Sequence, residues 1–252
     1  MHIQVVLMTL LLARAQELSV RTDISKAPSA EPFVRETEAL VKEWYPRVDA
    51  ILYGLGHALT YPEVRIIWLP KQQANWAAWV DDGNLFIPVT SLHNRADSYG
   101  GMIVHEIAHI AQNYNDTPKI SHWIVEGIAD YIRHKHFEKD IQTTFRLTQE
   151  GRLTGYTESE PFFFMLQQGK IDLRDKGYER RYTVASTFLY WLEQTKNPTI
   201  VVKLHKAIAN HRYSPEQFKE YCAADLDDLW TQFIAACLRT SRSPARTTER
   251  DY

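Results

Sequence analysis

The segment from Val104 to Tyr131 reads VHEIAHIAQNYNDTPKISHWIVEGIADY and combines an apolar composition with many ionisable side chains. His105 and His109 are four residues apart, and Glu126 and Asp130 repeat that spacing farther along. Residues four apart lie on one face of an α-helix, so each pair projects in a single direction. The segment therefore predicts two helices that present their ionisable groups to a common place.

Apolar residues surround the first pair of histidines, at Met102, Ile103, Val104, Ile107, Ala108, Ile110 and Ala111. A helix that is apolar all round is buried, and ionisable groups inside it need partners or a metal ion. His105, Glu106 and His109 form the H-E-x-x-H pattern, in which two imidazoles bind Zn²⁺ at roughly 2.0–2.1 Å. We therefore predict one catalytic Zn²⁺ bound by both histidines, with Glu106 as general base. The alternative is a surface helix without a metal.

A catalytic zinc site needs a third protein ligand, and we predict Glu126 on the following helix. That helix is again apolar, and Gly127 would permit close approach between helices. Asp130 shares a face with Glu126 and is expected to accept the remaining N–H of His105, which would fix its tautomer. The alternative for Asp130 is an ordinary salt bridge to a basic residue of the same helix.

Other histidines compete for the third ligand position. His122 precedes the glutamate by one turn and could face the same way, whereas His134 and His136 have the pattern of a solvated face. The H-E-x-x-H-x-x-G-x-x-H subclass is excluded, because Gln112 and Asn115 stand at its glycine and third-histidine positions.

Three stretches of the chain, HEIAHIAQ, WIVEGIADYIRHK and RRYTVASTFLYWL, resemble the plant basic secretory protein family. The resemblance extends over residues 33–210 and includes WAAWVDDGNLFIPVTSL. Members of that family look like secreted zincin-type metallopeptidases. The Glu-Gly-Ile-Ala-Asp stretch is separately similar to the gluzincin pattern, in which glutamate ligates zinc and aspartate supports a histidine.

The resemblance also implies a second hydrogen-bond donor to the oxyanion of the reaction. Tyr182 matches the tyrosine that begins a helix in the C-terminal part of the family, with Tyr131 and Tyr178 as alternatives. The chain departs from the family pattern at Arg181 and at residues 185–187, and its net charge of −2 is not basic.

These features predict a zinc-dependent metallopeptidase acting on a peptide or protein substrate. The substrate is expected to extend along an edge strand, either at residues 76–79 or at residues 84–87. Alternatives are a secreted zinc-binding defence protein with little proteolysis, a zinc hydrolase of another amide, and a purely structural or carbohydrate-binding module. The charge of −2 gives no reason to expect a nucleic-acid partner, and no apolar run predicts stable membrane insertion.

The start of the chain has the pattern of a secretory signal peptide. The apolar run IQVVLMTLLL is followed by Ala13-Arg14-Ala15, so we expect cleavage before Gln16 and a secreted or periplasmic protein.

The rest of the chain is expected to consist of a flexible segment at 16–32, an α+β zincin-like metallopeptidase domain at 33–240 and a disordered tail at 241–252. Within the domain, the sheet and active-site helices are predicted over 33–138 and a helical part over 139–240.

Hydrophobic periodicity predicts the individual elements. A helix is expected from Phe33 to Leu52, with strands at 64–69, 76–80 and 84–89, the last two joined by a hairpin turn at 81–83. Pro88 would place the end of the last strand at a sheet edge. Further helices are expected at 97–114, 121–137, 179–195, 198–210, 214–223 and 226–239. Cys222 and Cys237 form either one disulfide or two buried thiols.

Overall fold

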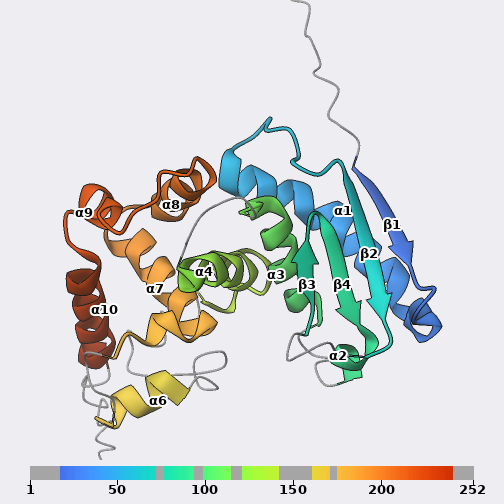
Figure 1. The fold of residues 1–252 in the computed structure, drawn as a ribbon. Helices are drawn as coiled ribbons and strands as arrows, with labels where there is room; N and C mark the ends of the chain where they lie inside the picture. Colours follow the sequence, from blue (N-terminus) through green and yellow to red (C-terminus); the bar gives the residue numbers. More distant parts are fainter. Residues whose placement is uncertain are drawn as a thin grey trace, which may run out of the picture.

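The chain has an α+β fold in which one small mixed sheet lies on one side of the molecule and most of the helices lie on the other (Figure 1). The computed structural model describes residues 18–71, 77–93, 99–114, 121–141, 161–170 and 175–240. The predicted signal peptide at 1–15 and the predicted tail at 241–252 lie outside the described residues. No helix among the described residues is long and apolar enough to cross a bilayer.

The sheet has four strands in the order β1-β2-β4-β3, which are β1 (Ser19–Asp23), β2 (Glu63–Leu69), β4 (Asn84–Pro88) and β3 (Trp79–Asp81). The outer strand β1 and the central strand β4 run parallel to β2, whereas β3 is antiparallel to β4. The predicted hairpin is present, because Asp82 and Gly83 join β3 to β4 with φ angles of 44° and 72°. Positive φ at both central residues is typical of the tight turn that suits a hairpin.

Two expectations about the sheet are wrong. Residues 19–23 form β1, although the segment 16–32 was expected to be flexible, because its polar residues pair in register with β2. Strand β4 is not an edge strand, since β2 and β3 flank it, so residues 84–87 cannot take up a substrate strand. Pro88 is accommodated as the last residue of β4, where a missing N–H interrupts little of the ladder.

Two helices, α1 (Glu31–Tyr53) and α3 (Tyr99–Gln112), pack together and against the sheet (Figure 1). Helix α1 continues through Pro46 and ends before Gly54, whose φ of 102° a residue with a side chain rarely adopts. The residues of β2 and β4 with 0% exposure are Val64, Ile66, Trp68, Leu85 and Ile87. The period-two pattern thus fixes which side of the sheet meets the helices.

The rest of the described chain is helical. Helix α4 (His122–Ile132) continues directly into a π-helical turn η3 (Arg133–Phe137), and the short helix α2 (Val89–His93) follows β4. The remaining helices are α6 (Pro161–Gln167), η4 (Gly177–Glu179), α7 (Tyr182–Thr195), α8 (Ile200–Ala209), α9 (Gln217–Cys222) and α10 (Leu226–Thr240). Cys222 and Cys237 are buried free thiols, so the disulfide alternative is wrong.

Gly127 permits the close approach between helices that the sequence predicted, and the helix it admits to α4 is α7. A Cβ built at this position would lie 3.0 Å from Ala185 Cβ and 3.3 Å from Leu189 Cδ1. We predict that Gly127→Leu lowers the free energy of unfolding by about 1–3 kcal/mol through overpacking. Urea denaturation measures this, with Ala235→Leu on the exposed face of α10 as the matched control. Equal midpoints for both variants would contradict the close approach of α4 and α7.

Candidate metal centre

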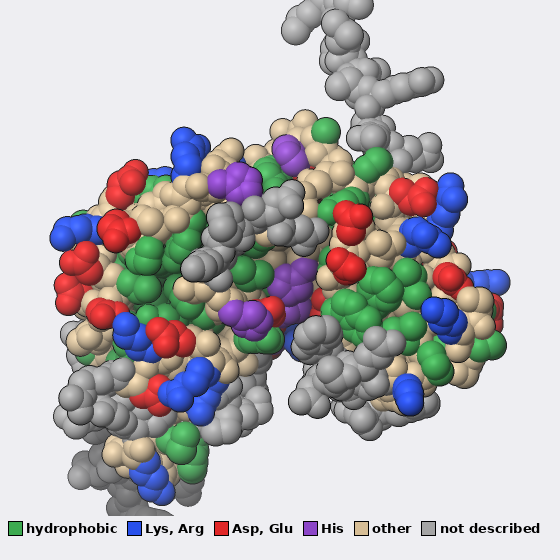
Figure 2. All heavy atoms as spheres, viewed as in Figure 1, with side chains coloured by type: hydrophobic (Ala, Val, Ile, Leu, Met, Phe, Trp, Pro, Cys, Tyr) green, Lys and Arg blue, Asp and Glu red, His purple; other side chains and the backbone are tan. Residues whose placement is uncertain are grey.

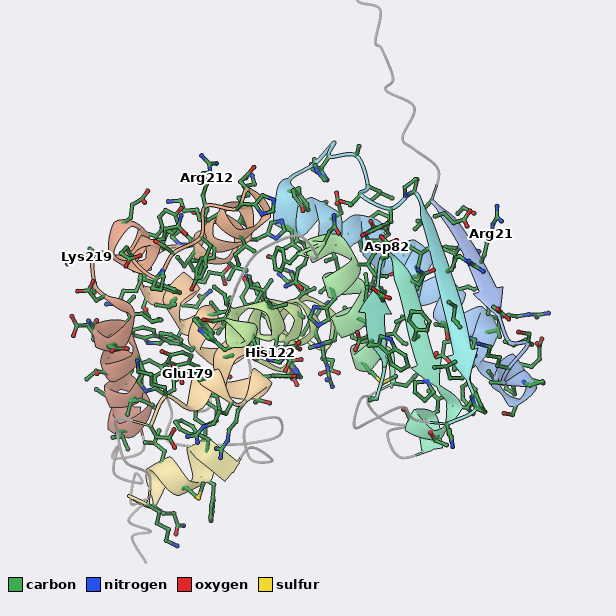
Figure 3. All side chains as sticks on the ribbon, in the orientation of Figure 1. Arg21, Asp82, His122, Glu179, Arg212 and Lys219 are labelled. Atoms are coloured by element: carbon green, nitrogen blue, oxygen red, sulfur yellow. The ribbon has the colours of Figure 1, made fainter. Side chains whose placement is uncertain are left out.

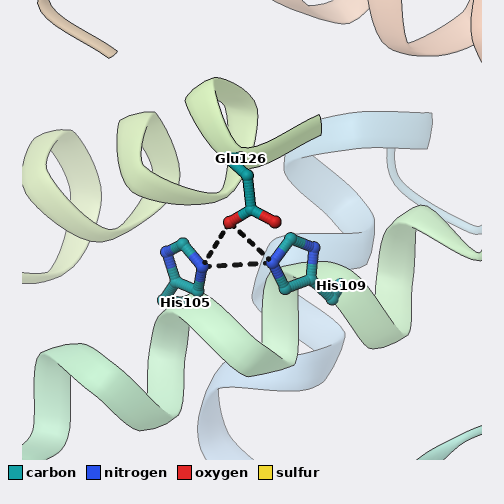
Figure 4. A group of neighbouring side chains, drawn as sticks. All are labelled: His105, His109 and Glu126. Atoms are coloured by element: carbon teal, nitrogen blue, oxygen red, sulfur yellow. Dashed lines mark hydrogen bonds and ion pairs between the residues drawn. The ribbon is translucent and has the colours of Figure 1, made fainter. Parts of the chain in front are cut away.

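His105, His109 and Glu126 bring three possible metal-ligand atoms together where α3 meets α4 (Figure 4). The Nε2 atoms of the two histidines lie 3.1 Å apart, and Glu126 Oε2 lies 3.2 Å from His105 Nε2 and 3.5 Å from His109 Nε2. In a tetrahedral zinc site with bonds of about 2.0–2.1 Å, neighbouring ligand atoms lie roughly 3.3–3.4 Å apart. The three atoms therefore have the separation that such an ion requires.

The centre is largely buried but remains accessible from one side. The side chains of His105, His109 and Glu126 are 11%, 17% and 13% exposed. Figure 2 shows histidine side chains at the hollow between the sheet side and the helical side of the molecule. The three ligand side chains are therefore not completely shielded from solvent.

A carboxylate fixes the ring orientation of the first histidine. His105 Nδ1–H donates a hydrogen bond of 2.7 Å to Asp130 Oδ1, as the sequence predicted. Because Nδ1 donates to Asp130, it is Nε2 that faces Glu126, and loss of the Nε2 proton leaves a lone pair there that a metal can use. The alternative salt bridges, from Asp130 to Arg133 or Lys135, are not found among the described residues, since Arg133 pairs with Glu138 and Lys135 with Glu193.

The amide of Gln112, which was not among the predicted site residues, performs the same task for the second histidine. His109 Nδ1–H donates to Gln112 Oε1 at 2.7 Å, and Gln112 Nε2 donates to the carbonyl of Val125 at 2.9 Å. The second bond decides which way the amide faces, so the oxygen must point to the histidine. The sequence does contain a feature that could have predicted this role. Gln112 is three residues after His109 on one helix, so the two side chains lie on the same face.

The charges of the centre are strongly coupled. Burial alone would lower the pKa of His105, but hydrogen bonds to Asp130 and Glu126 raise it to about 10. Burial would raise the pKa of Glu126, yet hydrogen bonds from His105 and His109 hold it well below its usual range. The centre therefore favours positive charge beside Glu126, which a proton or a divalent cation can supply.

Glu106 lies beside the three ligand atoms without joining them. Its side chain belongs to the buried part of α3, with 7% exposure, and is not part of the described metal-ligand group. Burial raises the pKa of the Glu106 carboxyl, and the imidazoles of His105 and His109 counteract this only in part. A carboxylate whose pKa is moved upward is a better proton acceptor near neutral pH.

Tyr182 begins α7 and lies at the rim of the centre. Its ring stacks on that of His105 with centroids 6.1 Å apart, and it is 42% exposed. Burial, followed by the negative charges of nearby carboxylates, raises the pKa of Tyr182 to about 12, so its hydroxyl remains a donor at neutral pH. Of the alternatives, Tyr131 already bonds Glu193 and Tyr178 is packed in an aromatic cluster, so neither hydroxyl is open to a substrate.

The competing histidines lie in different surroundings. His122 begins α4 with its side chain 70% exposed, and its Nε2 lies 3.4 Å from Glu126 Oε1, on the other oxygen of that carboxylate (Figure 3). The expectation of a solvated face for His134 and His136 is wrong. His134 has 2% exposure because it lies one helical turn after the buried Asp130 and shares its face. The Nε2 atom of His136 is also buried.

Comparisons with protein-family models, with curated proteins and with solved structures found no match to this chain. The resemblance to the plant basic secretory protein family therefore stays a prediction. Any function for the chain has to be argued from the geometry and chemistry of the centre itself.

Proposed function

We propose that this chain is a zinc-dependent metallopeptidase of the zincin-like, gluzincin type. The observation that carries the proposal is the 3.1–3.5 Å separation of the ligand atoms of His105, His109 and Glu126. The donor set of two imidazoles and one carboxylate is one that catalytic zinc sites use, with a fourth position left open. Bound there, Zn²⁺ would lower the pKa of a water molecule and polarise a carbonyl group.

The residues around the ligands supply the remaining chemistry. Glu106 would accept a proton from water and later return it to the leaving amine, a task suited to a carboxyl with a raised pKa. Tyr182 would donate its hydroxyl hydrogen to the developing oxyanion from the open side of the centre. Asp130 and Gln112 keep the ligand histidines in the required tautomers.

An extended peptide is the proposed substrate, and β3 is the strand on which it would align. Among the described residues, β3 is the last strand in the order β1-β2-β4-β3, so a peptide that adds to the sheet at this end would align beside β3. Strand addition bonds the backbone of the peptide and leaves its side chains to the surrounding pockets. This arrangement favours peptides over compact substrates.

We expect Gln112→Leu to weaken zinc binding by about 10- to 100-fold, because His109 would lose the acceptor that fixes its tautomer. Leucine has a similar volume, so circular dichroism is expected to show a folded protein. Competition with a chromophoric chelator measures the affinity, and Gln194→Leu on the exposed face of α7 is the matched control. Equal zinc affinity in both variants would remove Gln112 from the centre.

Hydrolysis of a quenched-peptide library by the zinc-loaded protein tests the proposal. We expect cleavage that a chelator abolishes and added Zn²⁺ restores. A protein that binds zinc at this centre but cleaves no peptide would instead be a zinc-binding protein of the same fold or a hydrolase of another amide. Assays with acylated amino acids and cell-wall peptides separate these two alternatives.

A further inference from the structure

A second group of metal-ligand side chains lies just beyond α4, in and after the π-helical turn η3. It consists of His134, Glu138 and Asp140, whose possible ligand atoms all lie within 4.8 Å of one another. The His134 side chain is 3% exposed, whereas those of Glu138 and Asp140 are 21% and 33% exposed. The imidazole is thus the buried member of the group, and the two carboxylates are its partly exposed members, which ions in solution can reach.

Carboxylate oxygens converge on a single ring nitrogen of His134. Its Nδ1 lies 2.9 Å from Glu138 Oε2, 3.0 Å from Asp140 Oδ1 and 3.1 Å from Asp140 Oδ2. A ring N–H carries one hydrogen and satisfies one acceptor well, so this arrangement offers more acceptors than the imidazole has donors. A cation that replaces the proton on Nδ1 could bind this nitrogen together with an oxygen of each carboxylate, after small shifts of the exposed carboxylates.

Glu138 is held in position before any ion arrives. Its Oε1 accepts a hydrogen bond of 2.9 Å from Arg133 Nε, which leaves Oε2 facing His134. The pair packs directly on α3 at Gly101, where an added Cβ would collide with Glu138 Oε1. A surface carboxylate normally has to be ordered when it binds, but this one already has a fixed direction.

We propose that His134, Glu138 and Asp140 bind a second divalent transition-metal ion, for which Zn²⁺ is the natural probe. An imidazole ligand favours zinc and similar ions over Ca²⁺ and Mg²⁺, which prefer oxygen ligands alone. His134 Nε2 lies 4.0 Å from Asp130 Oδ2, and the other oxygen of Asp130 holds His105. The second ion would stabilise the turn η3, which follows α4. Through Asp130 it would also stabilise the position of His105 in the first metal centre.

The proposal concerns binding and does not depend on peptide hydrolysis. The full-length chain is stripped with a chelator, reloaded with Zn²⁺ and desalted, and the ions per chain are then measured. We expect two ions for the natural sequence, one for Asp140→Ala, one for Glu126→Ala and none for the double variant. Asp228→Ala, which removes an exposed carboxylate from α10, is the matched control and should keep two ions.

Each result separates the two sites. Equal zinc content in Asp140→Ala and the natural sequence would overturn the second site. A single ion that is lost in Asp140→Ala but kept in Glu126→Ala would support the second site and contradict the first. Asp140→Lys, which places an ammonium at this partly exposed position, is a second variant that should also lose one ion. Filling of the site by Ca²⁺ in preference to Zn²⁺ would contradict the role of His134.

Discussion

Glu106→Gln is expected to abolish peptide hydrolysis while leaving the zinc content unchanged. Glutamine preserves the shape and packing of this buried side chain, but its amide cannot accept a proton from water. Removing a general base costs roughly 10²- to 10⁴-fold in rate. The variant should therefore bind one equivalent of zinc at the first centre and show almost no turnover of a quenched peptide.

Two measurements make this result decisive. Zinc content and turnover are determined on the same preparation, so that a loss of metal cannot be mistaken for a loss of the base. Glu36→Gln makes the same chemical change on the exposed face of α1 and should retain full activity. Full activity in Glu106→Gln would show that another group takes the proton.

The local part of the centre could be predicted from the sequence, because helical spacing is a strictly local property. The four-residue spacing determines that His105 and His109 share one face, and the same holds for Glu126 and Asp130. The apolar residues around both pairs required buried helices, and two buried helices joined by a short connection must pack on each other. These two conditions made a contact between the two helices the expected arrangement, and the structure brings the ligand atoms together there.

The parts that were missed depend on contacts between distant segments. The strand β1 has no strong apolar alternation of its own and forms by pairing with β2, some forty residues away. Gln112 acquires its role only when the carbonyl of Val125 fixes its amide. The burial of His134 was missed for a different reason. Its basic neighbours indicated a solvated face, although the four-residue spacing from Asp130 places His134 on the same buried face.

Zinc is expected to raise the melting temperature of the metal-free protein, and Glu126→Ala should lose this response. At a free Zn²⁺ concentration about 1,000 times Kd, binding adds roughly 4 kcal/mol to the free energy of unfolding. For a domain of about 150–250 residues, each kcal/mol corresponds to roughly 2–4 °C. The melting temperature should therefore rise by about 8–16 °C. When the second site is removed by Asp140→Ala, this rise reports zinc binding at the three-ligand centre alone.

The comparison is made in the Asp140→Ala background, so that an ion at His134 contributes nothing to the shift. In that background Glu126→Ala and His105→Ala should melt at the same temperature with and without zinc, since the two remaining ligands bind too weakly. Glu36→Ala is the control and should keep the full shift. An undiminished shift in Glu126→Ala would mean that zinc binds without this carboxylate, and the proposed catalytic geometry would then have no third ligand.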